Sequence, residues 1–171
     1  GPVLIDPLPL VDKALNQLKK VMAICLTGRF HQRSAWRYQS YFDVQVYAPH
    51  NGEMHEPFAG QPDKLYKPGD VLPGGIEVKH TPGPSEDHYS FYLPRKVESV
   101  FFSGDLLIRD SGDEHFRFVP DQFMVDPQRT RESVKKLLAM DIGLLCPNHG
   151  AYAKGNVHEL IQDALDKDNA E

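Results

Sequence analysis

The chain has 171 residues, of which 40% are hydrophobic and 25% charged, and its net charge is −5. These values are ordinary for a soluble fold and predict one domain over residues 1–171. The mild acidity argues against a nucleic-acid-binding protein, which usually has a basic stripe, and no apolar run approaches the ~20 residues of a membrane helix. No basic segment precedes the first apolar residues, and neither cysteine belongs to a disulfide or metal pattern, so we expect a cytoplasmic protein.

The first 50 residues alternate between strand and helix patterns. Residues 3–5, 21–26 and 43–47 are apolar or alternating runs typical of strands. Between the first two, Val11, Ala14, Leu15 and Leu18 recur at the spacing of one helix face. A second helix start is predicted near Ser34. This β-α-β-α-β order predicts a parallel sheet covered by helices.

The middle of the chain has short strand patterns without long helices between them. They cover residues 76–78, 89–93 and 100–102 and predict an antiparallel or mixed sheet. Residues 106–126 then form a long predicted loop, which is typical of a lid or a binding loop. If it is a binding loop, its aromatic side chains line a pocket. Alternatively, these side chains cover the core.

The end of the chain returns to the α/β pattern. Asp126-Pro127 predicts a helix start with an N-cap and a proline at the first position. Residues 143–146 predict a strand. The last helix opens with Asn156 and Glu159, a variant of the capping box.

Four loops that follow predicted strands contain polar residues out of keeping with simple turns. They are residues 27–33, 80–88, 103–105 and 147–150. In α/β sheets, ligands bind outside the carboxyl ends of the strands. These loops are therefore the candidate functional segments.

Five motifs appear in a fixed order along the chain. They are Leu4-Ile5-Asp6, Leu26-Thr27, His80-Thr81-Pro82-Gly83, Phe102-Ser103-Gly104-Asp105 and Cys146-Pro147-Asn148-His149-Gly150. In this order the chain resembles the metallo-β-lactamase superfamily. The resemblance implies an αββα sandwich of two mixed sheets flanked by helices, and a hydrolase of an ester, thioester, amide or phosphoester. Members usually have one or two further strands before the first motif, so we expect the first strand or strands to be lacking or missing here.

The resemblance also implies metal ligands, and at most of the ligand positions this sequence departs from the family. The residues at the lost positions are Gly28, Phe30, Gln32, Arg33 and Pro84. Asp105 and His149 match family ligands, and Asp6 matches a supporting carboxylate. Two ligands do not make a tight zinc site, since catalytic zinc needs three protein ligands.

Two interpretations of this degenerate metal site remain open. In the first, His31 and His88 join Asp105 and His149, and the site holds one zinc, iron or manganese ion. In the second, no metal binds, and Arg33, or Arg29 in the same loop, pairs with Asp105.

The candidate catalytic residues are Asp105, His149 and Arg33. The expected partner is a small-molecule substrate or ligand, and a homo-oligomer is left open. The alternative function is a non-catalytic protein of the same fold that serves ligand binding or assembly.

Overall fold

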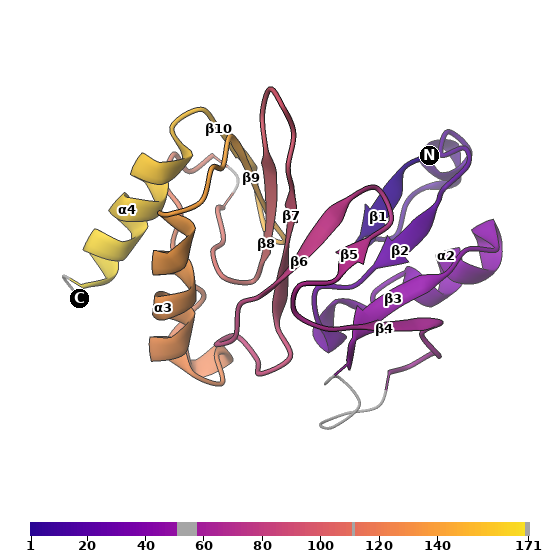
Figure 1. The fold of residues 1–171 in the computed structure, drawn as a ribbon, viewed down its shortest axis with the longest axis horizontal. Helices are drawn as coiled ribbons and strands as arrows, with labels where there is room; N and C mark the ends of the chain where they lie inside the picture. The colour runs from indigo at the N-terminus through magenta and orange to yellow at the C-terminus, as the bar shows by residue number, and fades with distance from the viewer. Residues whose placement is uncertain (51–57, 111, 170–171) are drawn as a thin grey trace. The chain divides into compact units, whose positions relative to one another are not determined.

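The computed structural model describes residues 1–50, 58–110 and 112–169 (Figure 1). The elements in chain order are β1 Val3–Ile5, α1 Asp12–Leu15, β2 Ala23–Cys25, η1 Arg29–His31, α2 Ala35–Phe42, β3 Val46–Pro49, β4 Lys64–Tyr66, β5 Val71–Leu72, β6 Ile76–His80, β7 Tyr89–Leu93, β8 Val100–Gly104, η3 Asp121–Phe123, α3 Pro127–Leu137, β9 Leu144–Pro147, β10 Ala153–Lys154 and α4 Val157–Asp168. Within these residues, no helix has both the length and the apolar character needed to cross a membrane.

The chain divides into two compact units, Gly1–Val78 and Lys79–Glu171. Strand β6 crosses the boundary, so that its last two residues belong to the second unit. The single domain expected over residues 1–171 stays a prediction.

The first unit contains a sheet with the order β1-β2-β3-β4 among the described residues. Its pairings are all parallel, as the alternating strand and helix patterns predict for β1, β2 and β3, whereas β4 is not among the predicted strands. Strand β3 begins later than the predicted run at residues 43–47, because Asp43 ends helix α2 in the left-handed conformation. The core of the unit contains Ile24, Leu26, Tyr38 and Val46, which come from β2, the residue after it, α2 and β3.

The second sheet has the order β10-β9-β8-β7-β6-β5 among the described residues. It mixes directions, since β7 pairs with β8 antiparallel and β8 pairs with β9 parallel. In Figure 1, α3 and α4 lie beside each other next to β8 and β9. Their apolar faces share one core with Phe101 and Leu145 of these strands. The predicted fold class, two sheets flanked by helices, is confirmed, with the mixture of strand directions confined to this second sheet.

Candidate functional site

In the first unit, the carboxyl ends of β1 and β2 bring Asp6 and Thr27 together. The two strands are parallel neighbours, so their last residues lie at the same edge of the sheet. The backbone N–H of Thr27 donates to Oδ1 of Asp6 at 2.9 Å, and its hydroxyl donates to Oδ2 at 2.6 Å. Asp6 is only 3% exposed, and these two bonds satisfy its buried carboxylate.

His31 extends this network. Its Nδ1 lies 3.3 Å from the hydroxyl oxygen of Thr27 and 3.9 Å from Oδ2 of Asp6. Because the single hydroxyl proton of Thr27 goes to Asp6, Thr27 can only accept from His31. Nδ1 therefore carries a proton and donates it to Thr27. Metal-binding histidines are commonly held in this way, through the ring nitrogen that does not bind the metal.

In the second unit, the carboxyl ends of β8 and β9 bring Asp105 and His149 together. The strands are parallel, and Gly104 stands opposite Pro147 in their register. Oδ1 of Asp105 lies 3.5 Å from Nε2 of His149. The carboxylate is 24% exposed and the imidazole 56% exposed. A carboxylate beside a half-exposed imidazole is a pair suited to acid–base chemistry or to metal binding.

His88 is held between two loops of the second unit. Its Nε2 accepts a hydrogen bond from the backbone N–H of Asp105 at 3.0 Å. The ring proton is therefore on Nδ1, which lies 2.8 Å from the carbonyl oxygen of Thr81. Since backbone groups engage both ring nitrogens, these contacts do not support the prediction of His88 as a metal ligand. Its role in the structure is to orient the Asp105 loop.

The other positions that the resemblance links to metal binding offer no suitable donor. The amide of Gln32 is engaged at both ends, because Nε2 donates to the carbonyl of Arg29 and Oε1 accepts from Trp36 and from Ala59. The carbonyl of Pro84 accepts from Val125. Arg33 is partly buried and has the unusual φ of +36°. Arg33 belongs to the first unit and Asp105 to the second, and their pairing stays a prediction.

The two cysteines are not activated nucleophiles. Burial raises the pKa of the Cys146 thiol to about 11. The pKa of Cys25 is raised further, by burial and then by the negative charge of Asp6. Both side chains are therefore protonated thiols at neutral pH, as expected for unreactive cysteines within strands.

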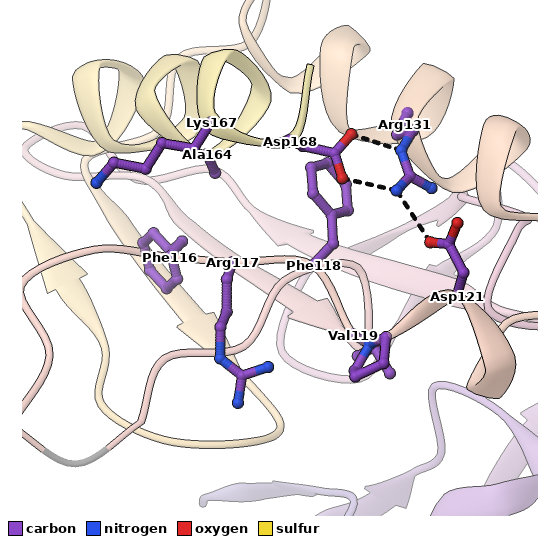
Figure 2. A pocket seen from close by; sticks show the side chains of 10 residues that line it. Phe116, Arg117, Phe118, Val119, Asp121, Arg131, Ala164, Lys167 and Asp168 are labelled. Carbon is purple, nitrogen blue, oxygen red and sulfur yellow. Dashed lines mark hydrogen bonds and ion pairs between the residues drawn. The ribbon is translucent and has the colours of Figure 1, made fainter. Parts of the chain in front are cut away.

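A cavity of about 580 Å³ in the second unit lies between the loop at residues 116–121 and helices α3 and α4 (Figure 2). Arg131 on its wall donates to both carboxylate oxygens of Asp168, each at 2.6 Å, and to Asp121 at 2.9 Å. The bonds to Asp168 are the main cause of a raised pKa for Arg131. Its charge is therefore neutralised within the wall. Phe116 and Phe118 of the predicted long loop line this cavity and also belong to the core.

Comparison with known proteins identifies the family. The family model of the metallo-beta-lactamase superfamily matches residues 26–149, which is more than half of the chain. The chain therefore belongs to the metallo-β-lactamase superfamily. A search among curated proteins found no match.

Solved structures support the same fold. The chain is 27% identical to TTHA1623, solved in a di-iron-bound form, with a TM-score of 0.70 over 96% of this chain and 88% of that one. BLEG-1, a B3 metallo-β-lactamase, is 23% identical, with a TM-score of 0.67 over 96% and 85% of the two chains. A metallo-β-lactamase from Pontibacter korlensis is 17% identical, with a TM-score of 0.73 over 99% and 82%.

Proposed function

We propose that this chain is a hydrolase of an ester, thioester, amide or phosphoester, with a metal ion bound at Asp105 and His149, for which the sequence predicts His31 as a third ligand. The observation that carries the proposal is the Asp105–His149 pair at the carboxyl ends of two parallel strands. The di-iron form of TTHA1623, a structure 27% identical to this chain, supports a metal in this fold.

The donor set fits a single metal ion. A catalytic zinc needs three protein ligands and one open position, and two imidazoles with one carboxylate also suit ferrous iron. Thr27 accepts a hydrogen bond from Nδ1 of His31, so Nε2 would be the ligand atom of this residue. The family's full ligand set is not available, since Gly28, Phe30 and Pro84 have no side-chain donor atoms.

The residues of the chain have separate tasks in this proposal. Asp105, His149 and His31 would hold the metal ion, which would supply Lewis-acid polarisation of the scissile carbonyl or phosphoryl group. Asp6 and Thr27 fix the ring of His31. Asp105 lies 3.5 Å from the imidazole of His149, and His88 fixes the backbone of Asp105.

The test is the metal content of the purified protein by mass spectrometry, after growth with zinc, iron and manganese. We expect about one equivalent of metal per chain, the number that one three-ligand site holds. His31→Ala, Asp105→Ala and His149→Ala should each lose it. His115→Gln, a change at an exposed histidine that is not a proposed ligand, should keep it. Turnover is then screened with esters, thioesters and phosphodiesters.

The alternative is a metal-free protein that binds a ligand, with Arg33 paired to Asp105. It is favoured by the arginine at a position where the family has a ligand. Absence of metal from every preparation would contradict the hydrolase proposal and support this one. In that case Arg33→Ala should lower the free energy of unfolding by about 3 kcal/mol or more, because it leaves Asp105 unpaired. A loss below about 0.5 kcal/mol, typical of a surface residue, would contradict the ion pair.

A further inference from the structure

We propose that Arg29 binds the carboxylate group of a small-molecule ligand. Arg29 lies in η1, in the loop that follows β2. Its Nε and Nη1 atoms are buried, and neither has a hydrogen-bond acceptor in the described part of the chain. This binding needs neither turnover nor a metal ion, so it goes beyond the proposed hydrolysis.

Unpaired guanidinium nitrogens are unusual inside a folded protein. An arginine side chain is always protonated, and buried N–H groups are nearly always paired. Arg131 of the same chain shows the ordinary solution, because its guanidinium donates to Asp168 and Asp121. The described residues provide no such carboxylate for Nε and Nη1 of Arg29, so these N–H groups are available to donate to an anionic ligand.

The guanidinium of Arg29 is already held in place. It lies over the ring of Phe30, 4.7 Å from the ring centre. The backbone of Arg29 is also fixed, because the Gln32 side chain donates to its carbonyl oxygen at 2.9 Å and in turn accepts from the indole N–H of Trp36. A ligand therefore meets an ordered donor, which reduces the entropy lost on binding.

The geometry favours a carboxylate over a phosphate. A planar guanidinium donates two parallel bonds to a planar carboxylate, and either pair of adjacent nitrogens includes one of the two unpaired atoms. Phosphates are usually held by a nest of successive backbone N–H groups. Gly28 does not begin such a nest, because its backbone is extended, with φ −170° and ψ 170°. Phe30, 59% exposed, offers an apolar surface to the rest of the ligand.

The experiment is a titration with benzoate, followed by NMR or calorimetry. We expect saturable binding of benzoate, and much weaker binding of its neutral analogue benzamide and of phenyl phosphate. Arg29→Met should weaken the binding of benzoate by about tenfold or more. Arg29→Lys should weaken it less, because lysine keeps the positive charge but lacks the two parallel N–H donors of a guanidinium. Arg37→Met is the matched control, since Arg37 is an exposed arginine in the same unit, with an ion pair to Asp12.

Thermal unfolding gives a second readout that does not depend on tight binding. Arg29→Met should raise the Tm of the ligand-free protein, because it removes two buried N–H groups that have no acceptor among the described residues. Benzoate should raise the Tm of the wild type and leave that of Arg29→Met unchanged. His149→Ala, which removes a proposed metal ligand, should still bind benzoate, so a failure of the metal site is distinguishable from a failure of this proposal.

Several outcomes would overturn the proposal. They are the absence of saturable benzoate binding by the wild type, equal benzoate affinity in the wild type and Arg29→Met, equal binding of benzamide, or a lower Tm of Arg29→Met in the absence of ligand. Tighter binding of phenyl phosphate than of benzoate would overturn the choice of a carboxylate.

Discussion

Gly104 is the residue on which the position of Asp105 depends. Its φ is +59°, a conformation that side chains disfavour, and a Cβ at this position would lie 2.4 Å from Nε2 of His88. The absence of a side chain therefore lets the His88 ring approach closely enough to accept the N–H of Asp105. In this way a glycine fixes the backbone of a candidate site residue.

We expect Gly104→Ala to lower the free energy of unfolding by about 2–4 kcal/mol, the sum of backbone strain and overpacking. Denaturation with urea measures the change. Gly155→Ala is the control, because Gly155 has a φ of +88° but nothing within 4 Å of an added Cβ. Gly155→Ala should lower the free energy of unfolding only by the backbone strain, about 1–2 kcal/mol. Equal losses in the two variants would contradict the close approach of His88.

Cys146 allows a prediction about pH. Since burial raises the pKa of its thiol to about 11, the native protein should react slowly with iodoacetamide at pH 7 and faster as the pH approaches 11. The unfolded protein should react as an ordinary thiol, with a pKa of about 8.5. The folded state therefore binds this proton more tightly. The resulting stabilisation is complete below about pH 8.5 and is lost as the pH rises through the folded pKa. Rapid labelling of the native protein at pH 7 would contradict the buried thiol.

At the scale of elements, the two C-terminal helices begin in different ways. The Asp126 side chain accepts the backbone N–H of Arg129 at 2.9 Å, and Pro127 occupies the first position of α3, as predicted. Asn156 was predicted to start a capping box, but its side chain makes no capping hydrogen bond. The reason is its backbone, which has φ −92° and ψ 35° rather than the extended conformation of an N-cap.

We therefore expect Asp126→Ala to cost about 1 kcal/mol of stability, and Asn156→Ala to cost only a few tenths. Urea denaturation of the two variants and the wild type gives both differences. Comparable losses in both variants would show that Asn156 also caps its helix.

At the scale of the whole molecule, we predict that residues 1–171 unfold as a single domain. Because β6 continues without a break across the boundary between the two units, unfolding of either unit disrupts a strand that reaches the other. Calorimetry should show one transition, with equal calorimetric and van't Hoff enthalpies. Two separate transitions would show that the units unfold independently.

Much of the fold and part of the site could be predicted from the sequence. The strands at residues 3–5 and 89–93 and the start of α3 lie where the local patterns place them, because periodicity and capping act over a few residues. Asp105 and His149 were singled out through the family resemblance, and both come just after predicted strands. Neighbouring parallel strands bring such residues to one edge.

The sequence by itself determined the order of strands and helices, the loops that hold polar residues, and the loss of most of the family's metal ligands. Only the tertiary structure decided what each polar side chain does. It made Nε2 of His88 the acceptor of the Asp105 N–H, placed a proton on Nδ1 of His31, and left two buried nitrogens of Arg29 without an acceptor among the described residues. The physical reason is that local patterns depend on neighbours in the chain, whereas hydrogen-bond partners and burial depend on groups that folding brings from distant positions.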